Sequence, residues 1–340
     1  MIDGIRMITV ENKKEWNELL FKCEKVSILQ TWEYGEAKQH AEGWIPIRSL
    51  ITDENKSIGI AQMLVKKIPL LGEVVRINRA PLIFSKDRKV CSDTSVEILQ
   101  FLYHYWVMQK KIPLLVAPNI MYGEICDEIL TQIGFGHNAE NRWASITIDL
   151  FHDEAILRKN LHQKWRNLLN KSEKVGLKLE MDNSEDGWSF LMSKYNQLMT
   201  EKNFSGTSER LLRELRNVTK DASSVQVMFA CKDGKRIGGV LIIGCVDTCH
   251  YLVGWNSPEG RLFQSNYFLL WQAVLIFKKM GFHWFDFGGV NEKLTPGITH
   301  FKRGIGGEEY TLIGEFEAFP DTVFSLIIKL IVKLKLRKKV

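Results

Sequence analysis

The stretch VQVMFACKDGKRIGGVLIIGCVD, residues 225–247, indicates the fold of the second half of the chain. It consists of two apolar runs around Asp233-Gly234, and an Asp-Gly pair between such runs is a strong signal for a β-hairpin. A strand pattern at 248–256, an apolar helix pattern at 266–281 and a buried strand pattern at 282–289 follow it. A helix that joins two strands of one sheet forms a parallel crossover. This half therefore predicts a mixed α/β layer.

The first half repeats this order. A hairpin turns at DENK, residues 53–56. It is followed by a strand at 72–84, a long apolar helix at 94–111 and a buried strand at 112–119. The second hairpin strand opens with an Ile-Gly pair in each half, Ile58-Gly59 and Ile237-Gly238. Strand, hairpin strand, strand, helix, strand is the order of N-acetyltransferase-like (GNAT) folds. One large sheet with similar local patterns is the alternative.

The predicted fold class is α/β (α+β), with two tandem GNAT-like domains that contain mixed sheets. The first is expected to span residues 1–148 and the second residues 149–319. Residues 320–340 are predicted to form a basic amphipathic helix, which can pack on the first domain.

Composition restricts the class of protein. A chain of 340 residues with 45% apolar and 25% charged residues is expected to form about two globular domains. The net charge of +6 fits a phosphate-bearing or anionic partner, although solvated surfaces often carry this balance. The six cysteines form no CxxC pair, so we expect reduced thiols and no metal site. The reduced cysteines favour a cytoplasmic protein, and we expect no secretory signal and no membrane span.

The segment FDFGGVNEKLTPGITHFKRGIGG, residues 285–307, contains six glycines and the cations Lys293, Lys302 and Arg303. Glycines let backbone N–H groups and cations approach a phosphate closely. The segment lacks the pattern of a P-loop, and GIGGEE breaks the dinucleotide pattern GxGxxG. An anion site is one interpretation, and a loop whose glycines only make turns is the other.

Three segments carry motifs in a fixed order: ILQTWEYGEAKQ at 28–39, LRKNLHQKWRNLLNKSEKVGLKLE at 157–180, and GFHWFDFGGVNEKLTPGITHFKRGIGGEEYTLIGEFE at 281–317. The third is the most specific, with Asp-Phe-Gly-Gly at a strand end, a Pro-Gly loop, Phe-Lys and a Gly-Gly pair. Together they resemble the Fem family of peptidoglycan interpeptide-bridge aminoacyltransferases, also called lipid II glycyltransferase-like proteins. The chain resembles the short members that lack a coiled-coil arm.

The resemblance implies transfer of an aminoacyl group from a charged tRNA to the stem-peptide amine of a peptidoglycan precursor, either lipid II or a UDP-linked muropeptide, with no cofactor. It assigns Phe301 and Lys302 to the catalytic motif, with Lys302 assisting substrate and transition-state binding. It assigns Lys38 to the diphosphate end of the precursor. Where many members carry an arginine, this chain has Lys202, so the precursor contacts there can differ.

Other residues are substrate-binding candidates. Thr31 is a plausible N-cap for a helix on which Tyr34 and Lys38 share a face. The candidates are Trp32, Tyr34, Tyr251, Trp255, Lys202, Asp286, Gly288, Gly289 and Arg303. Tyr251 and Trp255 occupy alternating positions of one strand, from which both could line an acceptor channel. Core packing is the alternative for the aromatic residues, and loop capping is the favoured role of Asp286. His300 is the nearest candidate base, although a substrate-assisted route needs none.

The choice of donor depends on two basic or glycine-containing regions. The helix at 157–178 could follow a tRNA backbone through Lys164, Arg166 and Lys171, although a solvated basic face is common. The loop GWNSPEGRLFQSN at 254–266 lacks the dense basic and glycine pattern that a GNAT enzyme uses for coenzyme A. An acyl-CoA-dependent N-acyltransferase that acts on a sugar precursor is therefore the second candidate. A non-catalytic protein that binds the precursor or RNA is the third.

The tail VFSLIIKLIVKLKLRKKV, residues 323–340, has Lys329, Lys333 and Arg337 at four-residue spacing. As a helix it could lie in an anionic membrane interface, which would place the protein peripherally on the inner face of the plasma membrane. It cannot span, because lysines interrupt it. The alternative is a last helix that packs on the first domain with its lysines outward.

Overall fold

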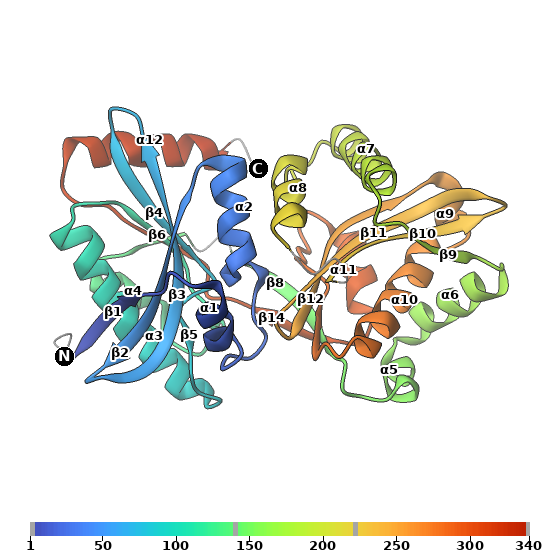
Figure 1. Cartoon of the computed structure of the whole chain (residues 1–340), viewed down its shortest axis with the longest axis horizontal. Coiled ribbons are helices and arrows are strands. Elements are labelled where there is room, and N and C mark those ends of the chain that lie inside the picture. Colours follow the sequence, from blue (N-terminus) through green and yellow to red (C-terminus); the bar gives the residue numbers. More distant parts are fainter. Residues whose placement is uncertain (1–3, 139–141, 220–223, 338–340) are drawn as a thin grey trace. The chain divides into compact units, whose positions relative to one another are not determined.

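The computed structural model describes residues 4–138, 142–219 and 224–337; for Asp127, Asn138 and residues 331–337 it describes only the backbone. The chain divides into two compact units. Unit 1 consists of Met1–Trp143 and Thr311–Val340, and unit 2 of Ala144–Tyr310. Each unit contains a mixed sheet with helices on its faces, as the labels in Figure 1 indicate for each separately. The predicted pair of mixed α/β domains is confirmed.

Unit 1 has the strands β1 (Ile5–Thr9), β2 (Ile45–Asp53), β3 (Lys56–Ile68), β4 (Gly72–Asn78), β5 (Leu82–Ile83), β6 (Leu114–Ala117), β7 (Gly136–Asn138) and β15 (Glu315–Ala318). Its helical segments are α1 (Lys13–Leu20), η1 (Ile28–Gln30), α2 (Trp32–Glu42), α3 (Arg88–Tyr103), η2 (His104–Gln109), α4 (Asp127–Ile133) and α12 (Val323–Arg337). The strand order is β1-β2-β3-β4-β6-β15-β7, with β5 beside β3. The strands β4 and β6 are parallel, as expected for a crossover through α3.

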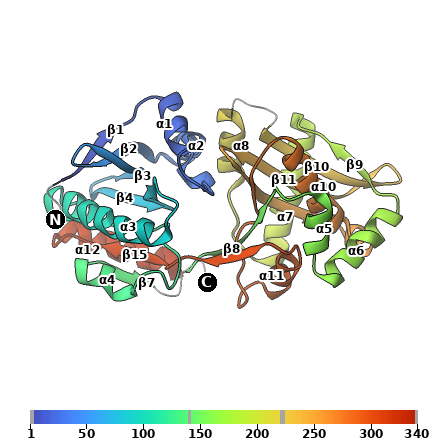
Figure 2. The same ribbon diagram turned by 90° about the horizontal axis from the view of Figure 1, so that it is seen from below.

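Helices cover both faces of the unit 1 sheet. Figure 2 shows α1 and α2 on one face and α3 on the other. Apolar residues of α3, among them Ile98, Leu99 and Leu102, pack with inward residues of β3 and β4 such as Met63 and Val75. Because alternate residues of a strand point to opposite faces, a sheet covered on both faces needs apolar residues at nearly every position. The strand β3 has this pattern, with a buried run from Gly59 to Val65.

Unit 2 has the strands β8 (Ala144–Asp149), β9 (Lys178–Met181), β10 (Val225–Lys232), β11 (Lys235–Cys245), β12 (Thr248–Asn256), β13 (Trp284–Asp286) and β14 (Glu308–Thr311). Its helices are α5 (Glu154–Asn160), α6 (Gln163–Lys174), α7 (Glu185–Lys202), α8 (Glu209–Val218), α9 (Pro258–Leu262), α10 (Ser265–Lys279) and α11 (Pro296–Arg303). The strand order is β9-β10-β11-β12-β13-β8-β14, and β12 and β13 are parallel. The core between this sheet and the helices α6 and α10 contains Trp165, Trp271 and Phe277.

Both predicted hairpins are present. The β10–β11 turn has two successive residues with positive φ, Asp233 (49°) and Gly234 (76°). The β2–β3 turn likewise has Glu54 (45°) and Asn55 (70°). Two successive positive φ values match the twist of the flanking strands. The local turn chemistry therefore explains why the hairpins could be predicted.

The two sheets have the same strand order, but each contains one strand from the other half of the chain. When the orders are aligned, β15 takes in unit 1 the place that β8 takes in unit 2. In unit 1, β15 pairs with β6 and β7, and in unit 2 β8 pairs with β13. The sequence-based boundaries at 148/149 and 319/320 therefore differ from those of the structure, at 143/144 and 310/311. The difference arises because short strands take their place from pairing partners that are distant in sequence.

The C-terminal segment forms a helix, as predicted. The helix α12 begins at Val323 and extends to Arg337, and Ser325 and Ile328 are its buried residues in the part with described side chains. Among the described residues, no helix is both long and apolar enough to cross a membrane.

Candidate active site in unit 2

The candidate site lies where the parallel strands β12 and β13 separate. The two strands pair through His250 and Asp286, which is the last residue of β13. On its other side, Asp286 is opposite Thr147 of β8. The carboxyl ends of neighbouring parallel strands are a common place for functional side chains in open α/β sheets. Asp286 is therefore positioned by the sheet.

Asp286 accepts hydrogen bonds from three segments of unit 2. The donors are Ser145 Oγ at 2.5 Å, the backbone N–H of Gly288 at 2.7 Å and the Tyr310 hydroxyl at 3.1 Å. His250 Nδ1 lies 4.0 Å from its carboxylate. The bond from Gly288 is the loop cap that the sequence favours for Asp286. The carboxylate thus fixes the start of the glycine-rich loop.

Glycine is required at position 288. Its φ is +72°, and a Cβ there would lie 3.1 Å from the backbone oxygen of Tyr251. A residue with a side chain would be strained in this conformation and crowded against β12. The close approach brings the carbonyl of Gly289 toward α11.

Lys302 comes from α11 and is directed into the unit. Pro296 begins this helix, a position where the missing N–H of proline does no harm. Thr299 and Lys302 are its buried residues, and only 8% of Lys302 is exposed. Lys302 Nζ donates to the carbonyl of Gly289 at 2.8 Å and lies 5.7 Å from the ring centroid of Tyr251. An ammonium over an aromatic face is stabilised by the ring quadrupole.

Burial changes the acid–base properties of this lysine. It lowers the pKa of Lys302 from its usual 10.5 to about 8, and the Asp286 carboxylate opposes the change. Burial raises the pKa of the Tyr251 hydroxyl, which therefore stays neutral near pH 7. Perturbed groups that gather at a strand end are typical of functional sites. The site holds one mostly protonated ammonium beside a neutral phenol and a carboxylate.

The predicted partnership of Tyr251 and Trp255 is wrong, because they lie on opposite faces of the sheet. The pairing of β12 with β11 shifts between Leu241 and Ile242, so that Leu252 is an extra residue on β12. Such a bulge inverts the alternation of side chains beyond it. Tyr251 accordingly packs against the core that contains α10, whereas the ring of Trp255 meets Phe190 of α7 at 5.6 Å.

The neighbours of Lys302 on α11 have structural contacts. Phe301 packs edge-on against Tyr267, at 4.9 Å between centroids, and lies 6.1 Å from Trp165. These contacts hold α11 against α6 and α10, so Phe301 orients the helix. Arg303 is ion-paired with Glu292 and with Glu309, whose nearer oxygen lies 2.6 Å from Arg303 Nε. These two carboxylates raise its pKa and already neutralise its charge. His300 is exposed on the same helix.

In unit 1, the structure places Trp32, Tyr34 and Lys38 on α2. Thr31 is the N-cap, as predicted, and accepts from the N–H of Tyr34 at 3.2 Å. Lys38 is ion-paired with Glu42, and its ammonium lies 5.9 Å from the ring centroid of Trp44. Burial and the Glu42 charge raise the pKa of Tyr34.

Trp32 has a partner that the sequence did not predict. The guanidinium of Arg48 lies 3.6 Å from its ring centroid, and Arg48 Nη2 also donates to the carbonyl of Trp32 at 2.9 Å. Arg48 is buried and bonds Gln62 at 2.8 Å and Glu36 at 2.9 Å. One face of Trp32 is thus occupied by a structural arginine that joins α2 to the sheet.

The remaining cations are at the surface of unit 2. Lys202 is exposed in the last turn of α7. Lys164 and Lys171 are exposed on α6, whose buried residues are Trp165, Leu169 and Ser172. Arg166 is half-buried and donates to the carbonyl of Lys159 at 3.3 Å. α6 therefore presents a basic face to solvent.

Of the candidate residues, the structure brings Lys302, Asp286, Gly288, Gly289 and Tyr251 together. Three neighbours of Asp286 were not expected from the sequence: Ser145, Tyr310 and His250. The motif of residues 285–307 contains none of them. Pairing of β13 with β8 and with β12 would have been the signal for two of them, but single sequences do not specify strand pairing.

Comparisons with known proteins give a consistent result. A model of the FemAB family matches residues 191–333, which include Tyr251, Asp286 and Lys302. A search of curated proteins finds no match.

Among solved structures, a crystal structure of FemX is similar, with a TM-score of 0.76, 15% identity and coverage of 96% of this chain and 99% of that chain. The structure of L-PGS from Bacillus licheniformis has a TM-score of 0.54 at 12% identity, covering 95% of this chain and 96% of that one. A conserved protein of unknown function from Bacteroides thetaiotaomicron has a TM-score of 0.52 at 10% identity, covering 93% and 99%. These likenesses concern the fold. Over residues 191–333, the family match confirms the resemblance to the Fem family.

Proposed function

From the FemAB match and the buried lysine within it, we propose that the chain is an aminoacyltransferase of cell-envelope biosynthesis. The donor is aminoacyl-tRNA, and the acceptor is the stem-peptide amine of a peptidoglycan precursor. The observation that carries this proposal is the placement of Lys302. Its ammonium is buried, fixed by the carbonyl of Gly289 and directed to the end of two parallel strands. A buried charge is retained only where it is compensated, or where function requires it.

The reaction needs electrostatic stabilisation more than a cofactor. The acceptor amine attacks the ester carbonyl, so that a C–N bond forms and the C–O bond to the ribose breaks. The proton that the amine loses ends on the ribose hydroxyl. Negative charge develops first on the carbonyl oxygen and then on the ribose oxygen. A fixed ammonium in a water-poor place stabilises such charge strongly.

Lys302 supplies that ammonium. At pH 7 a pKa of about 8 leaves it mostly protonated. Its bond to Gly289 keeps it in place, and Asp286 holds the loop that carries Gly289. Tyr251, neutral beneath the ammonium, forms an apolar wall with a polar tip. Asp286 is a positioning residue here, and the precursor itself can take up the proton of the amine.

The region between β12 and α10 supports tRNA over coenzyme A as the donor. In a CoA-dependent enzyme of this fold, the loop here would cradle a pyrophosphate. In this chain it forms α9, and a Cβ on Gly260 would lie 2.1 Å from both Asn256 Oδ1 and the carbonyl of Ile237. The chain's own groups fill this turn closely.

Seven other sequence candidates keep their roles within the proposal. Lys38 binds the precursor diphosphate by exchanging its Glu42 partner for phosphate, with Tyr34 beside it. In unit 2, the exposed Lys202 and the half-buried Trp255 contact the precursor. Lys164, Arg166 and Lys171 on α6 contact the tRNA backbone. The protein acts on the cytoplasmic side of the membrane, where charged tRNA is present.

A transfer assay tests the proposal. Purified protein is mixed with charged tRNA and either lipid II or its UDP-linked soluble form, and the new amide is detected by mass spectrometry. We expect product with tRNA, and a loss of at least about 100-fold in kcat for Lys302→Ala. Lys293→Ala, at an exposed lysine of the same loop, is the matched control. Product formed only with acyl-CoA would assign an N-acyltransferase, and binding without turnover would assign a non-catalytic protein.

A further inference from the structure

The helix α12 presents apolar side chains to solvent. Four of them follow the i, i+3, i+4, i+7 spacing of one helix face and, with Phe324 beside them, form what we name the apolar stripe: Val323, Leu326, Ile327, Leu330 and Phe324. Their exposed fractions lie between 41% and 73%. Leu70, in the turn between β3 and β4 of the same unit, is 95% exposed. Contiguous exposed apolar groups of this kind usually mark an interaction surface.

The orientation of α12 is the reverse of that of an ordinary surface helix. Ser325 and Ile328 face the unit, and the hydroxyls of Thr322 and Ser325 are 2.7 Å apart at the start of the helix. An amphipathic helix on a globular protein turns its apolar face to the core. Here a serine is buried while leucine and isoleucine are exposed. Packing on unit 1 alone therefore does not explain the sequence of this helix.

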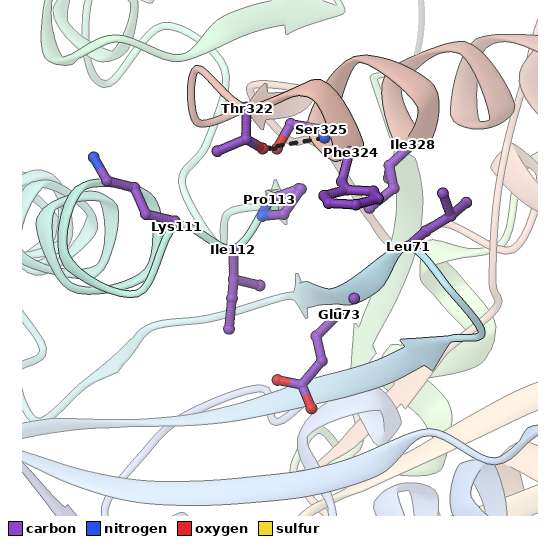
Figure 3. Close-up of a pocket in the computed structure, with 10 residues that line it drawn as sticks. Leu71, Glu73, Lys111, Ile112, Pro113, Thr322, Phe324, Ser325 and Ile328 are labelled. Carbon is purple, nitrogen blue, oxygen red and sulfur yellow. Dashed lines mark hydrogen bonds between the residues drawn. The ribbon is translucent and has the colours of Figure 1, made fainter.

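The start of α12 does not close against the sheet. A cavity of about 400 Å³ lies between it and two segments of unit 1, Leu71–Glu73 and Lys111–Pro113. Figure 3 shows Phe324 and Ile328 projecting from the helix at this cavity, with Leu71 and Pro113 among the residues that line it. Phe324 thus borders both the cavity and the solvent.

The basic excess of the sequence lies in the segment that contains the stripe. Residues 322–340 contain six of the 46 Lys and Arg residues and none of the 40 Asp and Glu residues. The rest of the chain therefore has 40 residues of each sign, and the whole net charge of +6 comes from this segment. The basic excess is thus a local property of the C-terminal segment.

We propose that α12 and Leu70 dock on an anionic phospholipid bilayer. Apolar side chains enter the interface, and Lys and Arg near them pair with lipid phosphates, each contributing roughly 1 kcal/mol or less. A helix of 15 residues is about 22 Å long, shorter than the apolar core of a bilayer, so it lies in the plane of the interface. A second copy of the chain fits this surface less well, because two segments of charge +6 would face each other.

This inference stands on the surface of unit 1 and does not rest on the proposed reaction. Binding of α12 to the membrane would bring the proposed reaction to the place where a lipid-linked acceptor is held. The vesicle experiment below uses neither tRNA nor precursor, so its failure leaves the transfer assay unaffected, and the reverse is also true.

The test is co-sedimentation of the full chain with vesicles of phosphatidylcholine that contain about 30% phosphatidylglycerol, or of phosphatidylcholine alone. We expect binding to the anionic vesicles, at least about tenfold weaker binding to the neutral ones, and a decrease with added salt. The variant Ile327→Glu/Leu330→Glu should bind at least about tenfold more weakly. The variant Phe21→Glu/Leu262→Glu changes two apolar residues elsewhere that are more exposed than Ile327 and Leu330, and it should bind as the wild type does.

Three results would overturn the proposal. The first is no binding to anionic vesicles. The second is equal binding by the stripe variant, which would assign the attraction to charge alone. The third is a dimer in light scattering that the stripe variant dissociates, without vesicle binding by the wild type. Circular dichroism and melting temperature establish that both variants are folded.

Discussion

Replacement of Lys302 by methionine should reveal the energetic cost of the buried ammonium. The substitution keeps a long, flexible side chain and removes the charge. Each unit of pKa corresponds to about 1.4 kcal/mol. The pKa of Lys302 falls from 10.5 to about 8 on folding, so keeping it protonated in the folded state costs about 3 kcal/mol. Methionine does not carry this cost, but it leaves the carbonyl of Gly289 without its donor, which costs about 1–3 kcal/mol.

The two terms nearly cancel at neutral pH, but their pH dependence differs. The folded wild type loses the Lys302 proton near pH 8, whereas the unfolded chain keeps it until about pH 10.5. Between these values the unfolded chain binds more protons, so raising the pH stabilises the folded wild type. The free energy of unfolding of the wild type, relative to Lys302→Met, should therefore rise by about 3 kcal/mol from about pH 7.5 to about pH 10.5. The gain is absent below pH 8 and complete above 10.5.

Urea unfolding at several pH values measures this difference, with tryptophan fluorescence as the probe. Other ionisable groups contribute equally to wild type and variant, so they cancel in the comparison. Lys293→Met removes an exposed charge from the same loop and should give a difference that stays flat. A difference that also stays flat for Lys302→Met would refute the burial of a charged lysine, and with it the electrostatic basis of the proposed reaction.

Three further outcomes are expected. Asp286→Asn should lower the pKa of Lys302 further, because the carboxylate raises it. Since kcat should fall when Lys302 loses its proton, this fall should move to lower pH in the variant. An unchanged pH profile of kcat would contradict the contact between the two residues. Gly306→Ala should destabilise the fold by at least about 2 kcal/mol, since its φ is +80° and a Cβ would lie 2.1 Å from the carbonyl of Asn160; an unchanged melting temperature would argue against this geometry. Arg48→Leu should destabilise unit 1 by about 3 kcal/mol in urea unfolding, and a loss below about 0.5 kcal/mol would show that its ion pair and ring contact contribute little.

Local sequence signals predicted the elements of the fold well. Asp233-Gly234 and the DENK turn specify hairpins through backbone conformations that these residues adopt easily. The long apolar helices were predictable because their patterns extend over many residues. The exchange of β8 and β15 was not, because each has fewer than seven residues and its partners are distant in sequence. Only tertiary pairing decides to which sheet such a strand belongs.

The site was predictable to the extent that its residues are close in sequence. Asp286, the glycine pair and Lys302 belong to one segment of 23 residues, in which glycines and cations stand out. Ser145 and Tyr310 donate to Asp286 from the first and the last strand of unit 2 along the chain. No residue near either of them in the sequence indicates these contacts. The extra residue at Leu252 reversed the expected relation of Tyr251 to Trp255. A strict two-residue period cannot anticipate such a bulge.

The exchanged strands also connect the candidate site to the folding of the whole chain. β8 supplies Ser145 to Asp286 and pairs with β13, yet it follows directly on the first half of the chain. β15 contributes Phe316 and Ala318 to the core of unit 1, and it is made after all of unit 2. Unit 1 therefore cannot complete its sheet until unit 2 has been synthesised, because β7 pairs with β15. Such non-local pairings slow folding, since a long loop must close before the contact forms. The same arrangement makes Asp286, at the end of β13, sensitive to the correct insertion of β8. A fold that misplaces this strand loses the hydrogen bond from Ser145 to Asp286, so the site depends on correct assembly of the sheet.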